Sequence, residues 1–253
     1  MQMPNNRDKI QIRGLCFQYE HRPLLENVSL RVADGEFVSL LGASGCGKST
    51  VLNLLAGILA PDRGEMLVDG QPISGMTGHF AYMPQNDLLF PWKTILENVC
   101  LYGRIHGGMR EARRQARALF PAFGLAGYEN AYPNALSGGM RQRAAFLRTA
   151  LCSAEILLLD EPFGALDVIS RGDMQDWLSA MKAQLNRTAL LVTHDVDEAI
   201  YLSDRIYVLG GTPTHVVYEV AVQEKNRTRD WLYEQGELRK ILHARIRGEE
   251  TDK

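Results

Sequence analysis

An eight-residue motif constrains this chain more than any other feature of its sequence. The motif reads Gly42-Ala43-Ser44-Gly45-Cys46-Gly47-Lys48-Ser49 and fills the pattern G-x-x-x-x-G-K-[ST]. A strand-like run at Glu36–Leu41 precedes it, and apolar residues at helical spacing follow it in Ser49–Leu59. A chance glycine-rich turn would fill this pattern in roughly one chain in a hundred. The succession of strand, loop and helix therefore predicts an α/β fold with a phosphate-binding loop.

Each residue type in the motif has a physical reason to be there. Glycines let the backbone curl so that successive N–H groups face inward, and the following helix adds its positive N-terminal end. Lys48 can reach the β- and γ-phosphates, and the hydroxyl of Ser49 can ligate Mg²⁺. The expected nucleotide contacts are Gly42, Ala43, Ser44, Gly45, Cys46, Gly47, Lys48, Ser49 and Thr50.

Two acids at the end of a later apolar run meet a second requirement of a magnesium-bound triphosphate. The run Ile156–Leu159 is followed directly by Asp160 and Glu161. Asp160 is suited to hold Mg²⁺, directly or through water, and Glu161 to accept a proton from an attacking water. The alternative is a strand that simply ends in solvent with two acids. The presence of the loop at Gly42–Ser49 favours the interpretation of the two acids as part of a nucleotide site.

A third segment lies between the loop and the acids, and it reads Leu136-Ser137-Gly138-Gly139-Met140-Arg141-Gln142-Arg143. Its serine and two glycines precede a predicted helix that begins near Met140. The free backbone N–H groups at the start of this helix could bind a second phosphate. The alternative is that Ser137 is an ordinary N-cap. One chain thus has one nucleotide loop and two candidate phosphate-binding ends.

Composition limits the partners that the chain can hold. Lys and Arg number 28 against 30 Asp and Glu, so the net charge of −2 gives no overall positive field for a nucleic acid or an anionic membrane. Any such contact must be local. Four scattered cysteines predict neither a disulfide framework nor a zinc site. Met1–Lys9 lacks the apolar core of a secretory signal, and no apolar run approaches the roughly 20 residues that span a bilayer. We expect a soluble chain in a reducing cytoplasm.

The order of the predicted elements indicates a parallel sheet covered on both faces. Strands are expected at Ile10–Tyr19, Val28–Val32, Glu36–Leu41, Glu65–Asp69, His79–Met83, Glu155–Asp160 and Thr188–Thr193. Helices are expected at Ser49–Leu59, Thr94–His106, Arg110–Phe123 and Ser170–Leu185, with one terminal amphipathic helix through Trp231–Ile246. A length of 253 residues suits one large domain with an inserted helical subdomain.

With these motifs in place, the sequence resembles the ATP-binding cassette (ABC) family of ATPases over about residues 10–222. The resemblance implies a P-loop NTPase (RecA-like) core with an N-terminal antiparallel β subdomain and an inserted α-helical subdomain. The corresponding domains are 1–90 with 155–222 for the core and β subdomain, 91–154 for the helical subdomain, and 223–253 for a C-terminal helical extension. It also implies that Ser137, Gly138 and Gly139 of one subunit close over the γ-phosphate of ATP held by another, in a head-to-tail dimer.

The resemblance assigns roles to four further residues. Tyr19 matches the aromatic that stacks on adenine, although Phe17 is a rival, and Gln85 matches the glutamine that reaches Mg²⁺ and the attacking water. Asp167 matches the residue that links the two sites across the dimer, and His194 matches the histidine that contacts the γ-phosphate. Each residue also has an ordinary structural alternative, namely a core aromatic, a solvated loop glutamine, a helix N-cap and a strand-end histidine. The functional assignment is favoured because five residues follow the loop in the order of the family, namely Gln85, Ser137, Asp160, Asp167 and His194.

The expected catalytic residues are Lys48, Gln85, Glu161 and His194, and the expected Mg²⁺ ligands are Ser49, Gln85 and Asp160. The mechanism is electrostatic positioning, in which loop amides, Lys48 and the partner copy's serine offset developing phosphoryl charge. Substitution of Glu161 by Gln is expected to keep ATP binding and block turnover.

Three strings resemble the ATPases of nitrate, sulfonate, taurine and pyrimidine-precursor importers: Glu161–Asp167, Phe90–Trp92 and Asp195–Ala199. A chain with a single cassette and no membrane span would have to dock on separate permease subunits, and the apolar loop Asp87–Ile95 is the expected docking segment. The implied place is the cytoplasmic face of the inner membrane, peripheral to it, with an extracytoplasmic binding protein as an indirect partner and no nucleic acid. The alternatives are an ATPase of a lipid-handling or cell-division complex and a DNA- or ribosome-associated ABC ATPase.

Overall fold

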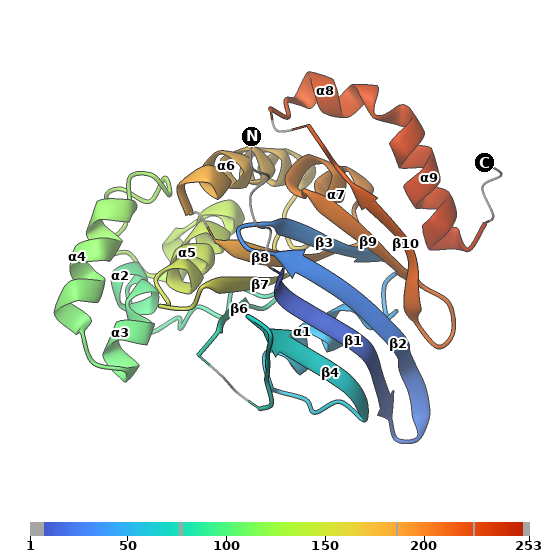
Figure 1. Ribbon diagram of the computed structural model, residues 1–253. Coiled ribbons are helices and arrows are strands. Elements are labelled where there is room, and N and C mark those ends of the chain that lie inside the picture. The colour runs from blue at the N-terminus through green and yellow to red at the C-terminus, as the bar shows by residue number, and fades with distance from the viewer. Residues whose placement is uncertain (1–7, 76–77, 186, 225, 250–253) are drawn as a thin grey trace, which may run out of the picture. The chain divides into compact units, whose positions relative to one another are not determined.

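The computed structural model describes residues 8–75, 78–185, 187–224 and 226–249 (Figure 1). The chain divides into two compact units, of which the first combines Met1–Phe80 with Asn186–Lys253 and the second is Ala81–Leu185. The boundaries 91 and 154 expected for a helical subdomain both lie inside the second unit and stay a prediction. The polar stretch Met1–Lys9 lies almost wholly outside the described residues.

An antiparallel sheet occupies the N-terminal part of the first unit. Its strands stand in the order β2-β1-β4-β5 and are β1 Asp8–Tyr19, β2 Arg22–Ala33, β4 Arg63–Val68 and β5 Gln71–Pro72. Apolar side chains of β1 such as Ile10, Ile12 and Leu15 are buried, because alternate residues of a strand share one face. The predicted strand at Val28–Val32 is confirmed but extends back to Arg22.

Parallel strands form the centre of the first unit. The neighbouring strands stand in the order β10-β9-β3-β8 and are β3 Phe37–Gly42, β8 Thr188–Thr193, β9 Arg205–Gly210 and β10 His215–Ala221. Strand β3 runs parallel to both β8 and β9, and every residue of β3 and β8 is buried. Continuous burial is the pattern of strands covered on both faces. Strands β9 and β10 were not among the predicted strands.

Four helices belong to the first unit: α1 Lys48–Leu55, α7 Val196–Leu202, α8 Arg229–Glu234 and α9 Gly236–Arg247. Helix α1 ends before the predicted Leu59, because Gly57 adopts a φ of +73°. The single predicted terminal helix is two helices, broken at Gln235 with a ψ of 37°. Figure 1 shows α8 and α9 beside α7 and β9, and contacts link α9 to both of these elements.

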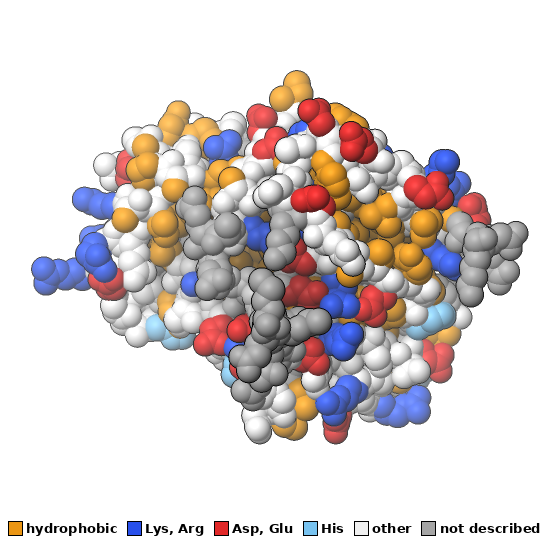
Figure 2. Space-filling view, turned by 45° about the horizontal axis from the view of Figure 1, so that its top comes forward, with side chains coloured by type: hydrophobic (Ala, Val, Ile, Leu, Met, Phe, Trp, Pro, Cys, Tyr) orange, Lys and Arg blue, Asp and Glu red, His pale blue; other side chains and the backbone are white. Residues whose placement is uncertain are grey.

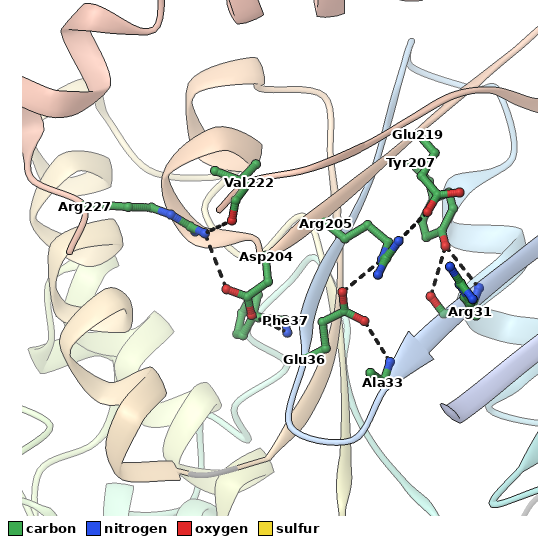
Figure 3. A network of polar contacts seen from close by, with 10 residues as sticks. All are labelled: Arg31, Ala33, Glu36, Phe37, Asp204, Arg205, Tyr207, Glu219, Val222 and Arg227. Atoms are coloured by element: carbon green, nitrogen blue, oxygen red, sulfur yellow. Dashed lines mark hydrogen bonds and ion pairs between the residues drawn. The ribbon is translucent and has the colours of Figure 1, made fainter. Parts of the chain in front are cut away.

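A polar network ties the central strands of the first unit together (Figure 3). The guanidinium of Arg205 donates to Glu36 Oε1 at 2.9 Å and also to Glu219 on β10. The other oxygen of Glu36 accepts from the backbone N–H of Ala33 at 2.7 Å. One arginine therefore joins β9 to the turn between β2 and β3 and to β10.

A second arginine fastens the start of the C-terminal extension. Arg227 has a side chain only 5% exposed, and it donates to Asp204 Oδ1 at 3.4 Å and to the carbonyl of Val222 at 3.0 Å (Figure 3). Asp204 in turn accepts the backbone N–H of Phe37 at 2.9 Å through its other oxygen. The contact links the segment before α8 to the first residue of β3.

The second unit is mainly helical. Its elements are β6 Phe80–Met83, α2 Ile95–Val99, α3 Leu101–Ile105, α4 Met109–Leu119, the 3₁₀ turn Pro133–Ala135, α5 Gly138–Ala150, β7 Ile156–Asp160 and α6 Val168–Leu185. Strands β6 and β7 are neighbours, although they are more than 70 residues apart in sequence. Three aromatic rings, those of Phe123, Phe146 and Trp177, pack together with centroids 4.8 to 6.3 Å apart and form a core between helices.

The predicted helix Thr94–His106 is two short helices. Thr94 and Glu97 form a reciprocal capping box at the start of α2, and Cys100, with a φ of −85° and a ψ of 12°, separates α2 from α3. None of the described helices combines the length and apolarity that a bilayer crossing demands.

Candidate functional site

The glycine-rich loop of the motif lies between β3 and α1 in the first unit. Gly45 and Gly47 adopt φ angles of +80° and +100°, which L side chains avoid, so the path of the loop depends on glycine at these positions. Lys48 is only 4% exposed, and its Nζ donates to the carbonyls of Gly42 and Ala43, each at 2.9 Å. Gly47 starts α1 without a side-chain cap. The loop thus joins a lysine to an uncapped helix N-terminus, which suits an anion.

Cys46 is turned toward the strand side of this loop. A Cβ built on Gly42 would lie 2.9 Å from Cys46 Sγ and 2.7 Å from the carbonyl oxygen of Leu209 on β9. Burial raises the pKa of the Cys46 thiol, and the nearby charge of Lys48 only partly opposes this. The outer face of the loop borders a cavity of about 390 Å³, which is also lined by Leu24 and by Ile246 of α9.

The structure separates the two aromatic candidates at the end of β1. Phe17 is buried with 8% exposure, whereas Tyr19 is 47% exposed, and their rings meet edge to face with centroids 4.7 Å apart. His194, which follows β8 in the first unit, is exposed. Only Tyr19 of the aromatic pair therefore has a ring face available for stacking.

The acidic half of the candidate site lies in the second unit, at the end of β7. Asp160 is 6% exposed, and its Oδ2 accepts a hydrogen bond of 3.0 Å from the hydroxyl of Tyr82 on β6. Burial, with the charge and hydrogen bond of Asp160, raises the pKa of Tyr82 far above its usual value, so the tyrosine stays protonated and donates. Tyr82 orients one carboxylate oxygen and was not predicted.

Glu161 stands in an unusual backbone conformation. Its φ is +42°, which costs a non-glycine residue of order 1–3 kcal/mol and is typical of functional turns. Glu161 Oε2 accepts from the side-chain amide of Gln85 at 3.4 Å, and its carbonyl accepts from the N–H of Gly164 at 3.0 Å. Two predicted catalytic residues, Gln85 and Glu161, are therefore in contact.

The serine-glycine segment opens α5 of the second unit. Ser137 is the N-cap, since its hydroxyl accepts the N–H of Met140 at 3.3 Å, and it is exposed. Further along the helix, the buried Gln142 donates to the carbonyl of Pro162, which follows Glu161. Asp167 accepts the N–H groups of Ile169 and Ser170 at 3.1 and 3.0 Å, and hydrogen bonds from Ser170 lower its pKa.

Two arginines of α5 hold the loop that follows Gln85. Arg141 Nε donates to Asp87 Oδ2 at 3.2 Å, and Arg148 donates to the carbonyls of Asp87 and Leu88 at 2.6 and 2.8 Å. The loop presents two large apolar side chains to solvent, with Leu88 59% and Trp92 69% exposed. Neither arginine was predicted as part of the site; no sequence signal marks them, since each acts on residues more than 50 positions away.

The predicted site residues thus fall into two groups. The first unit contains Tyr19, His194 and the loop Gly42–Thr50, and the second unit contains Gln85, the Ser137–Gly139 segment, Asp160, Glu161 and Asp167. Within the residues that the structure describes, no cluster of three or more His, Cys, Asp or Glu side chains forms a metal site by itself.

Comparisons with known proteins agree with these motifs. A family model described as ABC transporter matches residues 25–164, more than half of the chain. The formylaminopyrimidine import ATP-binding protein of Halalkalibacterium halodurans is 45% identical over 218 residues, which cover 85% of this chain and 85% of that protein. The taurine import ATP-binding protein of Yersinia pestis is 39% identical over 214 residues, 84% of each chain.

A solved structure shares the fold. The dimeric structure of the bacterial ABC transporter cassette MJ0796 superposes with a TM-score of 0.73 at 30% identity, covering 85% of this chain and 99% of that one. The predicted fold class, a P-loop NTPase core with an antiparallel β subdomain and an inserted helical subdomain, is confirmed.

Proposed function

Because the chain belongs to the ABC transporter family of ATPases, we propose that it is the ATP-hydrolysing subunit of an importer that takes up a small nutrient through separate permease subunits. The names of the similar proteins support import, since they refer to formylaminopyrimidine and taurine uptake. The substrate belongs to the class of sulfonates, nitrate, taurine or pyrimidine precursors of thiamine. It contacts the permease and a binding protein rather than this chain.

In this proposal the first unit binds the nucleotide. The amides of the loop and Lys48 hold the phosphates, and exchange of its present carbonyl contacts for phosphate oxygens would keep the ammonium of Lys48 hydrogen-bonded. Tyr19 stacks on adenine, which its exposed ring supports over the buried Phe17.

Mg²⁺ would be held by Ser49, Gln85 and Asp160. Their hydroxyl, amide and carboxylate oxygens are hard donors, which Mg²⁺ prefers, and the fixed carboxylate of Asp160 fits this role. When bound, the ion would supply neutralising charge to the phosphates. This donor set is the reason for including Mg²⁺ in the proposal.

Glu161 is the general base, and its contact with Gln85 is the observation that carries the catalytic proposal. A water that bonded to both side chains would be oriented by the amide of Gln85 and would give its proton to the carboxylate of Glu161 as its oxygen attacks the γ-phosphorus. The bond from that phosphorus to the β–γ bridging oxygen would break, and ADP would leave. The strained φ of Glu161 supports this role. His194 contacts the γ-phosphate and stabilises the charge that develops there.

The second half of each site comes from another copy of the chain. Ser137, Gly138 and Gly139 close over the γ-phosphate of the partner copy, and Asp167 links the two sites. The exposure of Ser137 at the start of α5 supports this role, as does the dimeric state of the similar cassette structure. Each dimer then encloses two ATP molecules.

The loop after Gln85 is the proposed permease contact. Exposed Leu88 and Trp92 offer an apolar surface, and Arg148 fixes the backbone of the loop to α5, which begins with the serine-glycine segment. A permease segment that moved this loop would therefore change the positions of both Gln85 and Ser137. In this proposal the chain lies at the cytoplasmic face of the inner membrane, peripheral to it.

The substitution Glu161→Gln tests the catalytic part of the proposal. Removal of the base should lower the hydrolysis rate by about 10²- to 10⁴-fold and leave ATP binding intact. Measurements of phosphate release and equilibrium ATP binding by the purified chain give the two quantities. Glu237→Gln, at a side chain 81% exposed on α9, is the matched control and should hydrolyse ATP normally. A Glu161→Gln chain with near-normal turnover would remove Glu161 from this role.

Co-purification tests the import part. The tagged chain should bring down a multi-span membrane protein, and in vesicles a loaded binding protein should raise its ATPase rate. Stimulation by DNA or ribosomes in place of the membrane protein would favour a nucleic-acid-associated ATPase. Association with a lipid-handling or cell-division complex would favour the third possibility. Either result would contradict import while leaving the ATPase assignment intact.

A further inference from the structure

Helix α4 carries four arginines on one face. Arg110, Arg113, Arg114 and Arg117 recur at the spacing i, i+3, i+4 and i+7, which places them on one side of a helix, and all four are exposed. We call them the arginine stripe. The opposite side of α4 packs inward through the buried Ala116. With 11 residues, the helix is about 16 Å long, so the stripe is a compact row of charge.

The charge of the stripe is largely uncompensated. Between residues 98 and 128 the chain has five arginines and a single acid, Glu111, although the chain as a whole has a net charge of −2. Glu111 is held by Arg114 at 2.8 Å and by Gln115 at 2.8 Å. Within the described residues, Arg110, Arg113 and Arg117 form no ion pair. Figure 2 shows Lys and Arg side chains projecting at the edge where Figure 1 has α4.

The stripe is presented on a tightly packed helical hairpin. Helices α3 and α4 approach so closely that a Cβ on Gly103 would lie 2.5 Å from the Cβ of Ala112. Gly107 and Gly108, with φ angles of +77° and +99°, make the turn between the helices. Ile105, at the end of α3, is 67% exposed. An apolar side chain therefore lies at the same end of the hairpin as the first arginine of the stripe.

We propose that the arginine stripe binds the anionic phosphate headgroups of a phospholipid surface. Guanidinium groups pair with phosphate oxygens through two parallel hydrogen bonds, and a row of them on a helix suits a plane of headgroups. Ile105 adds an apolar group that can enter the interface, which a nucleic acid or an acidic peptide would not require. The choice of a lipid surface rests on the proposed function, which brings the chain to a membrane.

Vesicle flotation of the complete chain tests the inference without permease or ATP. The vesicles are pure phosphatidylcholine, or phosphatidylcholine mixed with phosphatidylglycerol. The test variant combines Arg110→Gln, Arg113→Gln and Arg117→Gln, and it keeps Arg114 because that residue pairs with Glu111. Gln has a helix propensity close to that of Arg, so α4 should persist. The control variant combines Arg13→Gln, Lys240→Gln and Arg247→Gln, three exposed cations elsewhere, and has the same net charge.

The unchanged chain should float with the anionic vesicles at low salt and not with phosphatidylcholine. Each arginine near an anionic surface contributes a factor of roughly five, so the test variant should bind about 100-fold more weakly and the control variant within about threefold. Raising the salt should release the unchanged chain. Equal losses in both variants, no binding to anionic vesicles, or tighter binding of the stripe to a short RNA or an acidic peptide would overturn the inference. ATP hydrolysis by all three chains, measured in parallel, reports separately on the proposed function.

Discussion

Replacement of Gly64 by alanine should destabilise the antiparallel sheet far more than an ordinary surface substitution. Gly64 lies on β4 with a φ of +97°, where β4 pairs with the antiparallel strand β1. A Cβ there would lie 2.5 Å from the carbonyl oxygen of Gly14 and 2.7 Å from Leu15 Cα. Both are backbone atoms, so no side-chain rotation relieves the clash. The register between β1 and β4 shifts at this point, between Arg13 and Cys16.

Gly70 supplies a control that also has a positive φ but has no clash. Its φ is +76°, and no atom lies within 4 Å of a Cβ built on it. A left-handed conformation costs an L residue about 1–2 kcal/mol, so Gly70→Ala should lower the free energy of unfolding by about that amount. Gly64→Ala adds an overpacking cost of roughly 1–3 kcal/mol, which brings its total cost to about 2–5 kcal/mol. That is a large part of the roughly 5–15 kcal/mol stability of a typical domain.

Urea denaturation followed by circular dichroism measures both variants. Gly64→Ala should have a midpoint well below that of Gly70→Ala, which in turn lies slightly below the unchanged chain. Equal midpoints for the two variants would show that β1 and β4 move apart at little cost. The close approach of the two strands would then not determine the stability of the sheet.

The contacts of Arg227 and the thiol of Cys46 give two more predictions. Arg227→Gln removes a buried donor from Asp204 and from the carbonyl of Val222. The substitution should lower the free energy of unfolding by about 2 kcal/mol and make proteolysis before α8 faster. Lys240→Gln, at an 80% exposed side chain, is the control and should have neither effect. Burial raises the pKa of Cys46, so less thiolate is present at a given pH than in an exposed cysteine. The rate of alkylation of Cys46, followed by mass spectrometry, should therefore be low at neutral pH and rise about tenfold per pH unit. It should reach its plateau only above the pH at which the alkylation rate of a free cysteine peptide does. A plateau at lower pH would contradict the argument that burial raises the pKa of Cys46.

Local chemistry determined the parts of the site that the sequence alone predicted. The phosphate loop must have its glycines, lysine and hydroxyl at fixed spacing, and a strand and a helix must flank it, so Gly42–Ser49 was recognisable at once. The buried strand before Asp160 and the helix after Ser137 follow from apolar runs and capping residues in the same way. The glycine, apolar and capping patterns can be recognised from neighbouring residues alone, because each reflects the local backbone geometry of its own loop, strand or helix.

Only the tertiary structure decided which of these residues touch. Gln85 meets Glu161 and Tyr82 meets Asp160 across 76 and 78 residues, because β6 and β7 become neighbours in the fold. The same holds for Tyr19 and Phe17, because they lie two positions apart on β1, so their spacing does not distinguish them and only the tertiary packing leaves Tyr19 exposed and Phe17 buried. A side chain's spacing along the chain determines its face on its own element. What that face packs against is determined by the pairing of distant segments. This pairing brought the carboxylate of Glu161 into contact with the side-chain amide of Gln85.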